Sequence, residues 1–207
     1  MLFNSTEFIF IYLPLIFSGF LLLLRLFGYG TSVYFLAAAS LAFYGYWNPV
    51  YLLLIGSSIM VNYGLGKVLG PHEGAIRPYR RQLLILGVAF NVALLGYFKY
   101  SQMLTDAWFF VAGEDPPDLN VVLPLAISFF TFQQIAYLVD TYQGRLEGIE
   151  GDRSEYVLFV TFFPQLIAGP IVHYRRIVPQ FRQAWKSRLS IHELAIGLSI
   201  FLIGLFK

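Results

Sequence analysis

The chain has 207 residues, of which 57% are hydrophobic and 13% are charged, and its mean hydropathy is +0.65. Soluble domains carry about 25% charged residues, so this composition excludes an ordinary soluble globular domain and a disordered chain. A net charge of +2 argues against a nucleic-acid partner, and the absence of cysteine excludes disulfides and thiolate sites. We therefore expect an all-α, polytopic integral membrane protein that contacts membrane lipids.

Charge-free stretches predict the first membrane spans. Residues 8–24 form one apolar run, and residues 26–66 form an uncharged run of 41 residues. As a helix, the longer run would measure about 60 Å, twice a hydrocarbon core of about 30 Å, so we expect it to cross twice. The break should fall at Asn48-Pro49, because proline disfavours helix at the preceding residue.

Later apolar stretches cover residues 82–98, 119–139 and 156–174, and a last run of 13 residues covers 194–206. They predict about five full transmembrane helices, a re-entrant or broken segment, and a truncated last helix. On this interpretation, residues 1–207 are the N-terminal part of a single, longer transmembrane domain, and the chain is a fragment.

Basic residues in short loops predict the orientation. The loop 67–81 holds four basic residues, whereas 99–118 holds one against four acids, which places the first loop in the cytoplasm and the N-terminus outside. A full crossing by 156–174 would put the five basic residues of 175–188 outside. We therefore expect 156–174 to enter and return on one side, lining a cytoplasm-facing cavity.

The re-entrant turn is expected where helix-breaking residues interrupt the apolar segment. These are Pro164, Gly169 and Pro170, with Gln165 available to satisfy freed backbone groups. A simple structural kink is the alternative to a cavity wall.

Mid-span polar residues are the next candidates. Ser128, Thr131 and Gln134 share one helix face of about 120°, which predicts either the wall of a substrate tunnel or interhelical hydrogen bonding. Asp140 ends the same span. It is expected to orient a tunnel group, to pair with a basic residue of 175–188, or to serve as a simple interfacial carboxylate.

The basic run after 174 is expected to meet phosphates. Arg175, Arg176 and Arg182 would contact either the phosphates of coenzyme A or an acyl-carrier group, or anionic lipid headgroups. His173 has no visible carboxylate partner in the sequence, so we do not expect it to be catalytic. No His pair has the spacing of metal ligands.

Two long motifs resemble a known family. The stretches 127–144 (ISFFTFQQIAYLVDTYQG) and 156–172 (YVLFVTFFPQLIAGPIV) resemble the signature of membrane-bound O-acyltransferases. The opening MLFNSTEFIF and the segment FYGYW at 43–47 resemble the branch that acetylates bacterial polysaccharides.

The resemblance implies an enzyme of the bacterial inner membrane that moves an acyl group, expected to be acetyl, from a cytoplasmic thioester such as acetyl-CoA. The acceptor would be a hydroxyl of alginate or peptidoglycan, reached directly or through an extracytoplasmic partner protein; D-alanyl transfer to teichoic acids is the sister activity. No bound cofactor is implied. The family's catalytic histidine is expected beyond residue 207, so this chain alone should be inactive. A secondary transporter or channel, or a purely structural membrane scaffold, is the alternative.

Overall fold

The computed structural model describes residues 5–70, 77–149, 151–169, 172–186 and 190–205, and within these ranges every regular element is helical. The elements are η1 (Phe8–Tyr12), α1 (Leu13–Phe27), α2 (Tyr29–Trp47), α3 (Val50–Leu69), η2 (Arg77–Tyr79), α4 (Arg80–Ala112), α5 (Ile127–Tyr142), α6 (Arg153–Thr161), α7 (Phe163–Ala168), α8 (Tyr174–Lys186) and α9 (Ile191–Leu205). The predicted all-α membrane fold is confirmed.

Three of these helices are long and apolar enough to cross a membrane: the continuous stretch Phe8–Phe27, α3 and α4. They carry the kind of surface that lipid requires, because many of their large apolar side chains are exposed. The figure of five full spans stays a prediction, since α2 and the 16-residue α5 do not meet the same combination of length and hydropathy.

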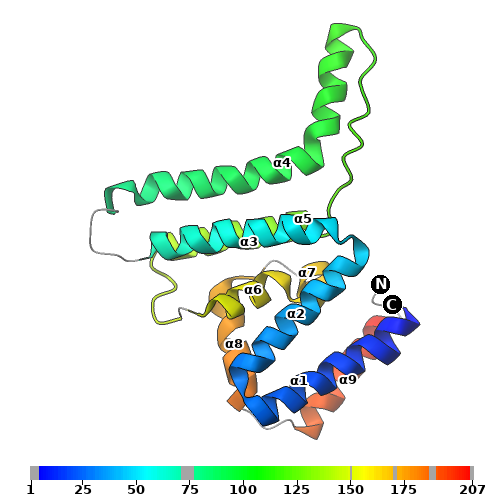
Figure 1. Cartoon of the computed structure of the whole chain (residues 1–207), viewed down its shortest axis with the longest axis vertical. Coiled ribbons are helices and arrows are strands. Elements are labelled where there is room, and N and C mark those ends of the chain that lie inside the picture. The colour runs from blue at the N-terminus through cyan, green and yellow to red at the C-terminus, as the bar shows by residue number, and fades with distance from the viewer. Residues whose placement is uncertain (1–4, 71–76, 150, 170–171, 187–189, 206–207) are drawn as a thin grey trace.

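The helices form two neighbouring groups (Figure 1). α3, α4 and α5 run alongside one another, and α2 packs mainly against α1 and α6. A buried core joins the groups through large side chains such as Tyr44, Ile55, Phe130 and Tyr156. A second cluster, around Phe8 and Phe43, ties η1 and α2 to α7.

Several boundaries follow from local backbone chemistry. The predicted break at Asn48-Pro49 is confirmed, because α2 ends at Trp47 and α3 begins at Val50. Gly28 separates α1 from α2 with a positive φ of 84°, a conformation that glycine adopts without steric cost. α6 begins with a capping box, in which Asp152 and Glu155 bond each other's backbone N–H groups.

Two predicted boundaries were wrong. The span at 82–98 was expected to end in a loop, but α4 continues to Ala112 and ends where Gly113 adopts a left-handed conformation. The span at 119–139 starts later, at Ile127, because prolines at 116, 117 and 124 keep the preceding chain out of helix.

Long-range hydrogen bonds show which segments lie together at each end of the α3–α5 helices. At one end, Tyr44 and Tyr51, on either side of the α2–α3 turn, donate to the carbonyls of Leu125 and Val122. At the opposite end, Arg80 donates to the carbonyls of Leu69 and Tyr142. The α2–α3 turn therefore lies beside residues 122–125, and the end of α3 lies beside the end of α5. The predicted sidedness, with the loop 67–81 in the cytoplasm and 99–118 outside, stays a prediction.

The segment 156–174 is broken, as the prolines predict. α6 and α7 have nine and six residues and meet at Phe162, so neither could cross a bilayer that requires about 20 residues. The ends of the segment lie together: the ring centroids of Tyr156 and Tyr174 are 6.2 Å apart. A spanning helix would hold its ends about 30 Å apart, so the chain turns back on itself.

Candidate functional site

A pocket of about 250 Å³ lies at the end of the molecule where α3 and α5 finish and α8 begins. Its wall combines tyrosine rings, glycine backbone and two charged side chains. The main contributors are Tyr63, Gly66 and Lys67 of α3, Tyr137 of α5, Glu147 of the following loop, and Tyr174 of α8. Aromatic rings beside exposed backbone suit a ligand that is partly apolar and partly hydrogen-bonding.

The packing of Tyr137 on Gly66 shapes one side of this pocket. A Cβ at position 66 would overlap the ring of Tyr137, so only glycine permits this approach. Tyr137 also packs against Tyr156, with ring centroids 4.5 Å apart, and against Tyr174, at 5.2 Å. These rings therefore hold α3, α5, α6 and α8 together around the pocket.

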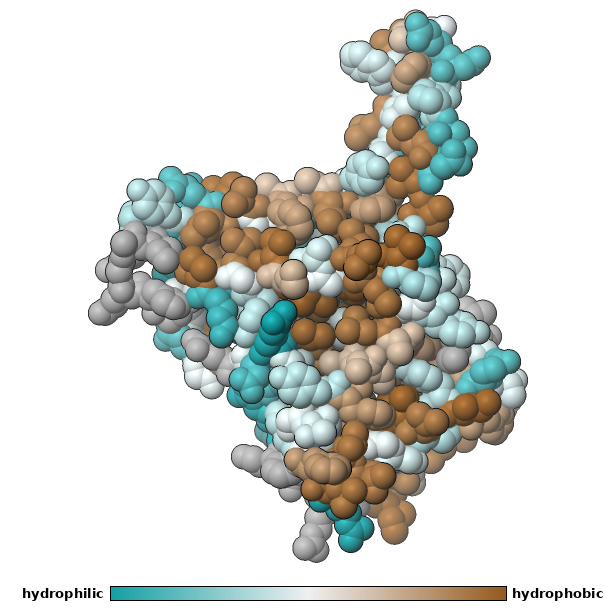
Figure 2. Space-filling view, viewed as in Figure 1, coloured by the Kyte–Doolittle hydropathy of each residue, from teal (hydrophilic) through white to brown (hydrophobic). Residues whose placement is uncertain are grey.

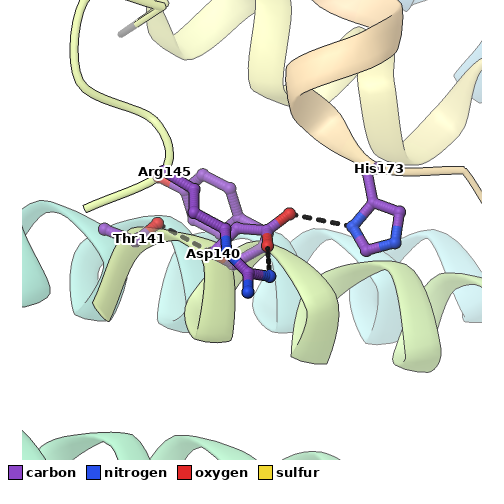
Figure 3. A network of polar contacts seen from close by, with 5 residues as sticks. Asp140, Thr141, Arg145 and His173 are labelled. Carbon is purple, nitrogen blue, oxygen red and sulfur yellow. Dashed lines mark hydrogen bonds and ion pairs between the residues drawn. The ribbon is translucent and has the colours of Figure 1, made fainter. Parts of the chain in front are cut away.

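Next to the pocket, a buried carboxylate joins α5 to the start of α8 (Figure 3). The Oδ2 atom of Asp140 lies 2.8 Å from Nδ1 of His173, and its Oδ1 atom lies 3.2 Å from Nη1 of Arg145. The side chain of Asp140 is only 2% exposed, whereas those of Arg145 and His173 are 49% and 43% exposed. The buried charge is thus paired on both oxygens, as a carboxylate in this environment requires.

This geometry corrects one sequence-based interpretation and adds to another. Among the described side chains, Asp140 pairs with Arg145 and His173, while the side chains of Lys186 and Arg188 lie outside that set. His173 does have a carboxylate partner, which the sequence hid because the two residues are 33 positions apart. A carboxylate on Nδ1 fixes the orientation of an imidazole ring. The side-chain hydrogen-bond partner of His173 within the described residues is Asp140, so the pair acts here as a link between α5 and the start of α8.

A second ion pair locks α8 onto α6. Arg182 donates from Nε and Nη2 to the two carboxylate oxygens of Glu155 at 2.8 and 2.7 Å, and the hydroxyl of Tyr29 donates to Oε1 at 2.6 Å. Burial alone would raise the pKa of Glu155, but hydrogen bonds from Arg182 and Tyr29 outweigh it, so the pKa lies below its ordinary value of 4.5. The same carboxylate raises the pKa of Arg182.

One residue of the predicted polar face of α5 forms a hydrogen bond to a neighbouring helix. Gln134 bonds the hydroxyl of Ser58 on α3, with Nε2 to Oγ at 3.1 Å, which supports interhelical hydrogen bonding for this residue. Thr131 is fully buried, and its hydroxyl has no partner among the described residues; Ser128 is half-buried. A tunnel along this face stays a prediction.

The predicted re-entrant turn falls on α7. Pro164 lies in its first turn, where proline is tolerated, and Gly169 follows its last residue. Gln165 was expected to satisfy freed backbone groups, but its side-chain Nε2 is buried without a partner in the described ranges. Pro170 lies outside the described residues.

The three predicted phosphate contacts differ in their surroundings. Arg182 is held by Glu155, which favours a structural role for it. Arg175 is half-buried and Arg176 is exposed on the first turn of α8, directly after His173. Contact of these arginines with phosphate or lipid stays a prediction. Within the described ranges, no three His, Asp or Glu side chains are grouped as metal ligands.

Sequence reasoning missed Glu155, Tyr29 and the tyrosines around the pocket. The capping-box pattern Asp152-x-x-Glu155 was a local signal for Glu155, but the pattern explains only its bond to the backbone of Asp152. The pocket tyrosines, Tyr63, Tyr137 and Tyr174, carry no distinguishing spacing, because they come from three separate helices.

The chain resembles known bacterial proteins over its whole length. A peptidoglycan O-acetyltransferase of Helicobacter pylori is 40% identical over 100% of this chain and 44% of its own length. The chain is similar throughout to bacterial O-acetyltransferases. Probable alginate O-acetylases of Pseudomonas putida and Pseudomonas aeruginosa are 33% and 34% identical over 100% of the chain and 42% and 39% of their own lengths.

A teichoic acid D-alanyltransferase of Bacillus subtilis is 33% identical over 49% of this chain and 28% of its own length. No protein-family model matches the chain, and no solved structure matches it significantly. The chain spans about two fifths of the length of the O-acetyltransferases described above. Both sequence motifs and the residues that line the pocket fall within the matched region.

Proposed function

We propose that the chain is part of a longer bacterial inner-membrane O-acetyltransferase that transfers acetyl groups from a thioester donor, such as acetyl-CoA, to hydroxyls of a cell-surface polysaccharide. The observation that carries this proposal is 40% identity along the whole chain to a peptidoglycan O-acetyltransferase. Peptidoglycan is therefore the first candidate acceptor, and alginate is the second because the probable alginate O-acetylases also align throughout.

The reaction replaces a thioester by an oxygen ester. The acceptor hydroxyl attacks the thioester carbonyl, its proton passes to a base, and the thiol leaves with the carbon–sulfur bond broken. By family resemblance, the base is a histidine beyond residue 207. This chain supplies the scaffold and the cytoplasmic side of the donor path.

The pocket at the ends of α3 and α5 is our candidate for the donor side. It lies at the end that carries the basic loop, with Lys67 in its wall and Arg175 adjacent to Tyr174. The phosphates of coenzyme A or of a carrier's prosthetic group are anionic, so cations near the pocket favour their approach. The acetyl group then passes to the acceptor or to an extracytoplasmic partner protein on the other side.

The test uses the full-length protein that contains this chain, expressed in a bacterium whose peptidoglycan lacks O-acetyl groups. We expect mild alkali to release acetate from purified peptidoglycan only when the protein is present. Replacing both Arg175 and Arg176 with Glu should lower this acetylation by about tenfold, while R81E, a charge reversal at an exposed arginine on the same side, should not. Unchanged acetate in cells that make the protein would reject peptidoglycan as the acceptor.

D-alanyl transfer to a teichoic acid is the second candidate, favoured by the similarity to the Bacillus subtilis enzyme. The shorter match, covering 49% of the chain, places it behind acetyl transfer. Assaying ester-linked D-alanine in the same samples separates the two activities, because each assay detects a different released acid.

A further inference from the structure

The distal part of α4 forms an arm that leaves the body of the molecule. α4 has 33 residues and would measure about 50 Å if straight, about 20 Å more than a hydrocarbon core needs. Figure 1 shows that the helix bends after its stretch beside α3 and α5, and that its remainder runs across their direction. We call residues 99–126, the remainder of the helix and the returning chain, the arm.

The returning chain is hydrogen-bonded to one side of the arm's helix. Gln102 donates to Asp106 Oδ1 at 2.8 Å and to the carbonyl of Pro117 at 3.3 Å, and it accepts from the N–H of Leu119 at 2.9 Å. These bonds fix the return segment along the side of the helix that carries Gln102 and Asp106. That side also gathers acids, because Glu114, Asp115 and Asp118 lie in the return segment.

The other face of the helix is apolar and uncovered. Tyr97, Tyr100, Leu104, Trp108 and Val111 follow one another at intervals of three and four residues, which places them on one stripe. Their exposed fractions are 60%, 40%, 61%, 75% and 85%. In Figure 2, the strongly hydrophilic residues of the arm gather along one side and at its tip, and hydrophobic residues are exposed along the rest of it.

The apolar stripe is continuous with the lipid-facing surface of the span. Leu86, Ala89 and Ala93 are exposed on the same stripe of α4, in the stretch that runs beside α3 and α5. At the bend, the lipid-facing surface of the span turns with the helix. It then lies at the boundary between the hydrocarbon and the headgroups. Tyr and Trp favour this boundary because they combine an apolar body with a polar tip.

We propose that the helix of the arm lies in the plane of the outer leaflet, with the Trp108 stripe buried at the boundary between headgroups and acyl chains. The acidic return segment then faces the water outside. Four acids against the single basic Lys99 give no attraction to anionic headgroups, so apolar burial holds the arm in place and its seating is insensitive to salt. The proposal does not depend on the proposed enzyme activity.

Fluorescence quenching tests the depth of Trp108. The complete protein is reconstituted in phosphatidylcholine vesicles with Trp108 as its sole tryptophan and every other tryptophan replaced by Phe. Lipids brominated near the headgroup should quench Trp108 more than lipids brominated near the chain end, and aqueous iodide should quench it weakly. The matched control carries W108F and D106W, which moves the probe to the opposite face; we expect strong iodide quenching and little lipid quenching there.

Three results would overturn the proposal. Stronger quenching by deep than by shallow bromine would mean that the helix continues as a span. Equal iodide quenching at positions 106 and 108 would mean that the stripe faces water. Protection of Trp108 from both quenchers would mean that protein, and not lipid, covers the stripe.

Discussion

At the residue scale, buried polar side chains are explained by reciprocal pairing. Asn62 of α3 and Asn91 of α4 are both fully buried, and each donates its amide to the other. Each also bonds a carbonyl of its own helix, Ser58 for Asn62 and Gly87 for Asn91. In a medium without water, an unpaired amide is costly, so the sequence could predict that these residues hold helices together, though not which partners they choose.

The Asn62–Asn91 pair gives a first prediction. Replacing Asn62 with Leu should destabilise the protein by about 1–2 kcal/mol, because it leaves buried polar atoms of Asn91 unpaired. The double variant N62L/N91L should lose less than the sum of the two single changes, since no orphaned amide is left. Thermal unfolding in detergent measures all three; strictly additive losses would show that the amides do not interact.

Glu155 gives a prediction about pH. Its pKa is lowered in the folded state, so its ion pair stabilises the protein fully above about pH 4.5 and the stabilisation is lost as pH falls through the lowered pKa. E155Q should cost about 1 kcal/mol near pH 7, a modest figure because Arg182 is partly exposed.

The cost of E155Q should shrink as the pH falls through this range, because the natural side chain then also loses its charge. The comparison uses the unfolding midpoints of the natural and E155Q proteins, measured in detergent near pH 7 and near pH 3. E147Q, at an exposed carboxylate in the loop between α5 and α6, serves as the control and should change little near pH 7 or near pH 3. A cost for E155Q that stays constant down to about pH 3 would contradict a charge-dependent role.

At the scale of the elements, two departures from the apolar pattern matter most. Hydropathy located α4 but not its length, since Tyr100, Gln102 and Asp106 lower the apolar signal while they continue a good helix. Hydropathy also identified the apolar segment 156–174, but it did not show that the chain turns back within it. Prolines predicted the interruption, but the return depends on the packing of Tyr174 against Tyr156 of α6 and on the Glu155–Arg182 pair.

The return of this segment predicts a labelling pattern. The natural chain has no cysteine, so single cysteines can report sidedness. Cysteines replacing the exposed Gln143 and Gln183, before and after the segment, should react with an impermeant maleimide from the same side of oriented vesicles. A cysteine replacing Asp118 should react from the opposite side. Reaction of positions 118 and 183 from one side would show that 156–174 crosses the membrane.

At the scale of the whole molecule, the pocket and its ion pairs collect at one end. Asp140 ties α5 to the start of α8, Glu155 ties α6 to α8 and α2, and Arg80 ties α4 to the ends of α3 and α5. Each of these links involves the end of a helix, whereas the hydrophobic core packs the helices together along their length. Polar contacts therefore fix the helix termini at the end where Lys67 and Arg175 lie.

The sequence alone determined that lipid surrounds this protein and that its fold is all-α. Scarce charge and long apolar runs require lipid around helices, and proline and glycine placed several helix ends, because these are effects of composition and of neighbouring residues. Only the tertiary structure decided that His173 meets Asp140, that Arg182 meets Glu155, and that three tyrosines line one pocket. Those contacts join residues tens of positions apart, and no local periodicity encodes which helix faces meet when the chain folds.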